Sequence, residues 1–321
     1  MEKSTLIVSL DYELFWGMQE VLPLEAYQEN LLGVREAVPK MLKLFEKHGI
    51  HATWAAVGFL FAENEQHLRQ YFPKELPSYD NPIRSPYPLF GKIGQNAAEA
   101  PCYYAPELIP MIAAAPGQEL GSHTFSHYYC LEKGQTPAQF RADLDAARTI
   151  AGDQGFELTS IILPRNQCAP EYVPVIKAAG FTAYRDEEND WIHEKVHFTP
   201  LLRILRLADV YLPLTGQGGY VPKVEDGIVN LVGSRMYKPF FKPLAAFEWL
   251  KLRRIKRQML HAAKNGLTFH LWWHPHNVGV RTDLHMQQLE DIFSYYEELK
   301  EKYGMRSLNM GEAAREVLNR G

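Results

Sequence analysis

The chain has 321 residues, of which 46% are hydrophobic, and a formal net charge of −4. This is long for one ordinary domain, but α/β barrels reach this size as a single unit with a large buried core. The slightly acidic balance argues against a general nucleic-acid or membrane-surface binder, so we expect no nucleic-acid partner.

The sequence also indicates a compartment. No apolar run approaches the roughly 18 residues that a transmembrane helix needs, and no signal peptide precedes the first predicted strand. The three cysteines, Cys102, Cys130 and Cys168, are widely spaced and form no CxxC pair. They are typical of reduced thiols, and we expect a cytoplasmic protein.

Helical and strand patterns alternate along most of the chain. Strands are predicted at 5–10, 52–57, 119–123, 160–163, 181–184 and 267–273. Helices are predicted at 24–48, 59–71, 106–115, 137–152, 171–179, 244–265, 283–302 and 311–319. This order is that of a parallel α/β fold. Residues 185–222 carry no clear pattern, and no element is predicted there.

Residues 72–106 interrupt this alternation with seven prolines and several aromatic residues between them. A flexible linker would be poorer in aromatic residues. We therefore predict an ordered insertion that packs on the body and forms one wall of the active site.

Several chemically active residues lie at or just after the carboxyl ends of predicted strands. They are Asp11, Glu13, His123, His127, Arg165 and His274. In a parallel barrel these ends lie on one face, which carries the active site, so the six side chains are expected to share one pocket.

The most informative pattern is His123-Thr124-Phe125-Ser126-His127. Two histidines four residues apart suit one divalent metal, and a single added carboxylate leaves a coordination position open for catalysis on zinc. A second carboxylate, Asp11, and a third histidine, His274, would then supply a base and an acid. Taken singly, Asp11 is also compatible with a helix N-cap, and His274 with a packed strand histidine. Arg165 alone is compatible with a surface salt bridge.

In this order the motifs resemble those of the polysaccharide deacetylase family, the relatives of the nodulation-type chito-oligosaccharide deacetylases. The resemblance implies an α/β fold, a distorted and incomplete (β/α) barrel, as one catalytic domain over residues 1–321 with the ordered insertion at about 72–106. It also implies metal-dependent removal of N- or O-acetyl groups from sugars.

The family motifs assign roles to residues of this chain. The resemblance implies Asp11 as the catalytic base, with His123 and His127 as metal ligands. The family usually has a metal-binding aspartate where this chain has Tyr12, so Glu13 is expected to be the third ligand. Arg165 is expected to pair with Asp11 and to keep it ionised.

The remaining motifs concern the leaving group and the groove. His274 is expected to be the acid, with His276 as the alternative, and Asp190 to orient it. A backbone amide near Asn166 is expected to bind the oxyanion. The residues expected to contact substrate are Trp16, Asn166, Trp191, Trp273 and His276.

The function expected from these motifs is hydrolysis of an acetyl group on a carbohydrate, with one divalent metal, Zn²⁺, as cofactor. A cytoplasmic enzyme would act on an oligosaccharide or on a nucleotide- or lipid-linked precursor of a surface polysaccharide. Two alternatives stay open: a metal-free hydrolase of a cyclic amide with the same fold, and a catalytically inactive sugar-binding relative. The basic segment 251–257 is either a solvated helix face or a contact for a nucleotide or an anionic lipid.

Overall fold

The computed structural model describes residues 3–94, 96–186 and 200–320. Ten strands of this described chain join in one sheet. They are β1 (Thr5–Tyr12), β2 (Ala52–Ala56), β3 (Gln118–Ser122), β4 (Ser160–Ile162), β5 (Ala183–Arg185), β6 (Lys223–Glu225), β7 (Ile228–Asn230), β8 (Arg235–Met236), β9 (Thr268–Trp273) and β10 (Arg306–Leu308).

The strand order is β6-β7-β5-β4-β3-β2-β1-β9-β8, and β10 pairs with the first half of β1. All neighbours are parallel except β6 and β7. Among the described strands β6 and β8, at the two ends of this order, do not pair with each other, so the barrel does not close. The predicted distorted, incomplete (β/α) barrel is confirmed.

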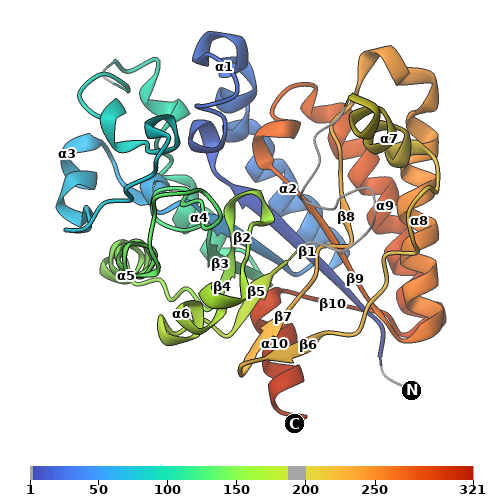
Figure 1. The fold of residues 1–321 in the computed structure, drawn as a ribbon. Coiled ribbons are helices and arrows are strands. Elements are labelled where there is room, and N and C mark those ends of the chain that lie inside the picture. Colours follow the sequence, from blue (N-terminus) through green and yellow to red (C-terminus); the bar gives the residue numbers. More distant parts are fainter. Residues whose placement is uncertain (1–2, 95, 187–199, 321) are drawn as a thin grey trace.

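Helices surround the sheet, with α8 and α9 along one side and α5 and α6 along the other (Figure 1). Their bounds are α1 (Leu24–Leu32), α2 (Val34–His48), α3 (Glu65–Leu68), α4 (Leu108–Ala114), α5 (Pro137–Asp153), α6 (Val173–Ala178), α7 (Pro200–Tyr211), α8 (Glu248–Asn265), α9 (Thr282–Tyr303) and α10 (Met310–Leu318). Within the described ranges, no helix has both the length and the apolar character of a membrane span.

The barrel interior is layered because alternate residues of each strand point to the same face. Apolar side chains form a buried cluster of Ile7, Ala55, Ile162, Ala183, Val229 and Leu231. Residues of α10 complete this cluster, so α10 closes the lower end of the barrel (Figure 1). Further along β1 and β5 the layer becomes polar, with Ser9 and Arg185 fully buried.

The predicted helix 24–48 is divided at Gly33 for a tertiary reason. A Cβ atom at Gly33 would lie 1.9 Å from the carbonyl oxygen of Gly279, so the two chain segments touch through their backbones. The predicted helix 59–71 is wrong as one element. It consists of a 3₁₀ turn (Gly58–Phe61), α3, which Asn64 caps by accepting from His67 N, and a further turn (Arg69–Tyr71).

The insertion packs on the body through aromatic rings and hydrogen bonds. Phe90 contacts Phe59 edge to face, with ring centroids 5.4 Å apart. Trp16 Nε1 donates to the Tyr103 carbonyl oxygen over 2.8 Å. These contacts are those of an ordered segment, and its role as a wall of the substrate cleft stays a prediction.

Candidate metal centre and active site

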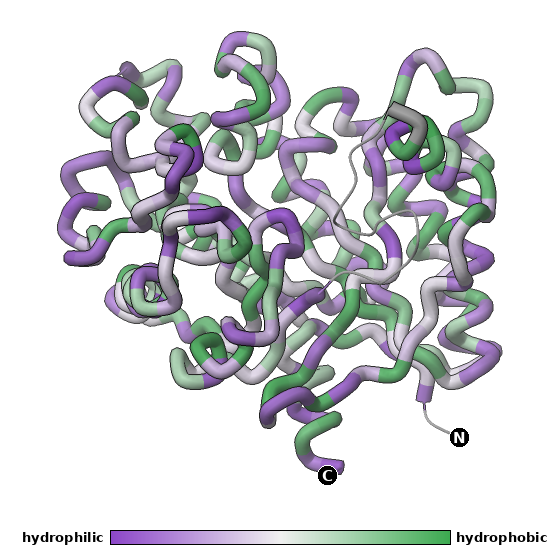
Figure 2. Tube along the Cα trace, in the orientation of Figure 1, coloured by the Kyte–Doolittle hydropathy of each residue, from purple (hydrophilic) through white to green (hydrophobic). Residues whose placement is uncertain are grey.

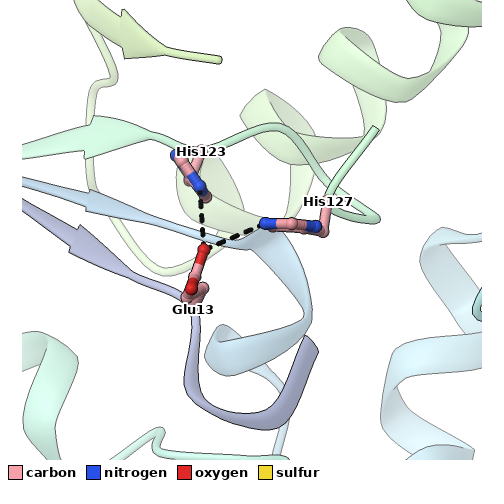
Figure 3. Close-up of side chains that lie close together, drawn as sticks. All are labelled: Glu13, His123 and His127. Atoms are coloured by element: carbon pink, nitrogen blue, oxygen red, sulfur yellow. Dashed lines mark hydrogen bonds and ion pairs between the residues drawn. The ribbon is translucent and has the colours of Figure 1, made fainter. Parts of the chain in front are cut away.

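Glu13, His123 and His127 converge in the mouth of the barrel (Figure 3). Glu13 Oε2 lies 3.2 Å from His123 Nε2 and 2.9 Å from His127 Nε2. All three side chains are buried. Two imidazole nitrogens and one carboxylate oxygen facing a common point are the donor set of a catalytic zinc site with room for a further ligand.

Strand alternation explains why Glu13, rather than Tyr12, supplies the carboxylate. Ser9, Asp11 and Glu13 share one face at the end of β1, and Tyr12 points to the opposite face. The Tyr12 ring packs against Trp54 with centroids 6.4 Å apart and is fully buried. The tyrosine is therefore a core residue and does not compete for the metal.

The loop after β3 presents the two histidines in an unusual backbone conformation. Thr124 and His127 both have positive φ angles, of 65° and 58°. Such angles are costly for residues other than glycine and persist only where surrounding contacts hold them. Here Asp143 of α5 supplies those contacts by accepting from Phe125 N over 2.7 Å and from Ser126 N over 3.2 Å.

The protonation states of Glu13 and His127 fit a cation. Burial raises the pKa of Glu13, but the histidines around it outweigh burial and hold that pKa well below its usual range. Burial lowers the pKa of His127, which keeps it neutral as a metal ligand must be. His127 Nδ1 lies 3.0 Å from the Tyr129 hydroxyl, which directs Nε2 toward Glu13.

Asp11 lies beside the centre and is held by Arg185, at the end of β5. Arg185 donates from Nη1 to Asp11 Oδ1 over 2.8 Å and from Nη2 to Oδ2 over 2.7 Å. Burial raises the pKa of Asp11, but Arg185, His274 and His123 more than offset it, so that the pKa is lowered. Asp11 is therefore an ionised carboxylate.

A buried network fixes Arg185 in place. Its guanidinium donates to Ser9 Oγ over 2.9 Å and from Nη2 to Asn166 Oδ1 over 2.7 Å. Ser9 Oγ lies 2.7 Å from His270 Nε2. Burial, with Arg185 nearby, lowers the pKa of His270 to about 3. The neutral imidazole accepts from Ser9, which leaves the serine oxygen free to accept from Arg185.

His274 is the histidine at the solvent side of the pocket. Its Nε2 lies 3.7 Å from Asp11 Oδ2 and 3.5 Å from Glu13 Oε1, and its side chain is 20% exposed. The ring of His276 stacks on it with centroids 5.1 Å apart. Burial lowers the pKa of His276 to about 3, so His276 is neutral and supports His274.

Part of the chain is similar in sequence to a known protein family. Residues 31–184 match the family model for polysaccharide deacetylase. Residues 31–184 of this chain therefore carry the polysaccharide deacetylase domain, over slightly less than half of its length. No protein of curated function matches it in a sequence search.

The deacetylase fold also links the chain to solved structures of low sequence identity. A candidate polysaccharide deacetylase from Mycobacterium smegmatis is 13% identical with a TM-score of 0.61, over 99% of this chain and 92% of that one. A second candidate, from Pseudomonas aeruginosa PAO1, is 13% identical with a TM-score of 0.56, over 97% and 89%. The Puue allantoinase is 13% identical with a TM-score of 0.53, over 97% and 88%. At this identity the similarity establishes the fold.

The predicted pairing of Arg165 with Asp11 is wrong, because Arg185 occupies that position. Arg165 forms an ion pair with Glu20 over 3.0 Å, and its guanidinium lies 4.4 Å above the ring of Tyr129. Its backbone has a φ of 57°, and its side chain is 36% exposed, away from Asp11.

Three predicted substrate contacts are also wrong. Trp16 and Trp273 are fully buried core residues. On β9 it is Trp272 that shares a face with His274, and Arg185 lies 4.3 Å above its ring. Asn166 directs its side chain to Arg185, and its backbone N–H donates to the Leu163 carbonyl oxygen, so it offers no amide to an oxyanion.

Asp190 and Trp191 lie outside the described residues.

The residues that sequence reasoning missed are Arg185, His270, Asp143 and Tyr129. Arg185 directly follows the predicted strand 181–184 and so met the same positional criterion as Arg165. Asp143 carried a weaker signal: it is a charged residue on the apolar face of a predicted helix.

Proposed function

We propose that this protein is a metal-dependent hydrolase that removes an N- or O-acetyl group from a carbohydrate. The observation that carries the proposal is the common point faced by Glu13 Oε2, His123 Nε2 and His127 Nε2, with Asp11 and His274 at its side. A base, an acid and a metal-ligand set within one pocket are the components of hydrolysis of an amide or ester.

Each residue has a distinct role in this proposal. A divalent cation, Zn²⁺ by its donor set, supplies the Lewis acidity that polarises the acetyl carbonyl. Asp11 is kept ionised by Arg185 and accepts a proton from the attacking water. His274 is the accessible histidine and donates a proton to the departing amine or alkoxide oxygen. General acid and base groups of this kind each contribute about 10²–10⁴-fold in rate.

The proposed substrate is an acetylated sugar in the cytoplasm, either an oligosaccharide or a nucleotide- or lipid-linked precursor of a surface polysaccharide. All three cysteines belong to the described chain and none is joined in a disulfide, which supports a reducing compartment. Burial raises the pKa of Cys102 to about 11, so this thiol is packing rather than a nucleophile.

The alternative of a metal-free hydrolase of a cyclic amide has some support, since the fold is also that of an allantoinase. The complete Glu13, His123 and His127 set favours the metal-dependent deacetylase. In an inactive sugar-binding relative, the buried Asp11–Arg185 pair would serve stability alone, and an accessible His274 beside it would have no catalytic use. That alternative is therefore the weaker one.

Acetate release tests the proposal. Purified protein is supplied with N-acetylated sugar nucleotides and with N- and O-acetylated oligosaccharides, and wild type is compared with His274→Ala. We expect the substitution to lower kcat about 10²–10⁴-fold with bound metal unchanged. His261→Ala, on α8 outside the pocket, is the matched control and should leave kcat unchanged. Hydrolysis of a cyclic amide by chelator-treated protein, without acetate release, would instead establish the metal-free alternative.

A further inference from the structure

A surface formed by α7 and α8 combines exposed apolar side chains with arginines. We call it the α7–α8 patch, and it consists of Ile204, Leu207, Leu212, Trp249, Arg253 and Arg257. Its four apolar side chains are 43–64% exposed. In Figure 1, α7 lies beside the upper end of α8, and in Figure 2 its turns alternate between hydrophobic and hydrophilic colours. Exposed apolar groups rimmed by charge mark an interaction site.

The patch is continuous because two helical stripes meet at one pocket. Ile204, Leu207 and Tyr211 are spaced three and four residues apart, so they lie on one face of α7. Trp249, Arg253 and Arg257 are spaced four residues apart and form the corresponding stripe on α8.

A pocket of about 240 Å³ joins these stripes and is lined by Tyr211, Leu212, Arg253, Arg254 and Arg257. The lining therefore includes Tyr211 from the α7 stripe and Arg253 and Arg257 from the α8 stripe. It also includes Leu212, the first residue after α7. The apolar and the cationic members of the patch thus open on the same surface.

The pocket carries an excess of positive charge. The ion pairs that α8 forms within the described chain use Lys251, Arg254 and Lys256, and neither Arg253 nor Arg257 takes part in them. Two carboxylates lie beside the pocket. Glu248 accepts from the Tyr211 hydroxyl over 3.2 Å and pairs with Lys251. The second carboxylate is Asp209. It is shared by two guanidinium groups, Arg254 over 2.7 Å and Arg235 over 2.8 Å. The wall behind the exposed arginines is therefore itself cationic.

We propose that the α7–α8 patch binds an anionic phospholipid surface. Guanidinium groups pair with phosphate oxygens through two parallel hydrogen bonds, and tryptophan and leucine side chains enter the boundary between headgroups and acyl chains. The net charge of −4 repels such a surface elsewhere on the molecule and thereby orients it. This activity is independent of acetate release.

The composition of the patch does not fit two other partners, a second copy of this chain and a free phosphate or nucleotide. In a symmetric dimer through this patch, Arg253 and Arg257 would contact the same patch of the second copy, which contains no carboxylate to pair with them. A free phosphate or nucleotide would account for the arginines but not for exposed Ile204 and Trp249, which lie outside the pocket lining.

Vesicle flotation tests the proposal with the full chain. We expect wild type to float with phosphatidylglycerol–phosphatidylcholine vesicles but not with phosphatidylcholine alone, and added salt to weaken the binding. The double substitution Arg253→Gln with Arg257→Gln should reduce the affinity roughly 30-fold, from the contribution of each cation near an anionic surface. Ile204→Asn with Leu207→Asn should also reduce it. The matched control is Lys300→Gln with Lys302→Gln on α9, which changes the net charge equally and should bind as wild type.

Any of the following results would overturn the proposal. One is equal flotation with neutral and anionic vesicles. Another is wild-type binding by the Arg253 and Arg257 double variant, whose fold and acetate release serve as checks. A third is a dimer of wild type in sedimentation equilibrium that is lost in the same double variant. A fourth is binding of inorganic pyrophosphate by a protein that does not float with either kind of vesicle. Acetate release fails separately from all of these, because none of the substituted residues lies in the catalytic pocket.

Discussion

The substitution Arg185→Met tests the buried pair that holds the base. Arg185 is fully buried and Asp11 is 4% exposed, and two hydrogen bonds of 2.8 Å and 2.7 Å join them. Loss of the guanidinium leaves a buried carboxylate without its cation, and breaking such a pair destabilises a protein by about 3–5 kcal/mol. Urea unfolding near neutral pH measures this loss.

The same substitution predicts a shift in the pH profile. The lowered pKa of Asp11 contributes stability that is present above 3.8 and is lost as pH falls through the folded pKa. Without Arg185 burial dominates and raises that pKa, so the base protonates at higher pH. The acidic limb of kcat/KM for acetate release should therefore move to higher pH.

Arg165→Met is the matched control, because Arg165 is the other arginine at a strand end of this face. It is 36% exposed and pairs with Glu20, so its loss should cost about 1 kcal/mol or less and leave the acidic limb in place. Arg185→Lys keeps the charge but not the two-pronged geometry and should give a smaller shift. A limb that moves in Arg165→Met and stays in both Arg185 variants would refute the reasoning.

Three further predictions concern the loop and the insertion. Burial raises the pKa of Asp143 from 3.8 to about 7, so its contribution to stability is lost as pH rises through this range. Asp143→Asn should therefore remove a slope of up to about 1.4 kcal/mol per pH unit in urea unfolding, and an unchanged slope would contradict it. Tyr129→Phe removes the hydroxyl on His127 Nδ1 and should weaken metal binding about 10–100-fold by metal-buffer titration, whereas Tyr128→Phe should not. In limited proteolysis the insertion 72–106 should resist cleavage, and rapid cleavage that substrate does not slow would count against a cleft wall.

The metal centre was predictable from sequence because its signals are local. His123 and His127 belong to one loop, and Glu13 shares a strand face with Asp11 by an alternation of two residues. Tyr12 also follows from that alternation, since it must point to the opposite face. Local geometry of this kind needs no knowledge of how strands are ordered.

The choice of arginine was not predictable, because it depends on long-range register. Arg165 and Arg185 both follow strands of the same barrel face, and only the packing of β5 with its neighbours brings Arg185 to Asp11. The same limit applies to Trp272 and Trp273. Nearly every residue of β9 is buried, so hydropathy does not reveal which face each one occupies.

The predicted helix boundaries are wrong where distant backbone segments meet. The periodic pattern of 24–48 contains no strong stop at Gly33, and the break arises from the approach of Gly279. Strands β6, β7, β8 and β10 were missed, and each has only two or three residues. Such short strands depend on pairing for their existence and carry little periodic signal.

A zinc titration tests the proposed catalytic metal site most directly. Chelator-treated protein is supplied with increasing Zn²⁺, and acetate release from an acetylated oligosaccharide is measured at each ratio. We expect no release without metal, full release at one equivalent, and no recovery in His123→Ala, which lacks one of the three ligands. Undiminished acetate release from the metal-free protein, or recovery in His123→Ala at one equivalent, would contradict the assignment of Glu13, His123 and His127 as the catalytic metal site.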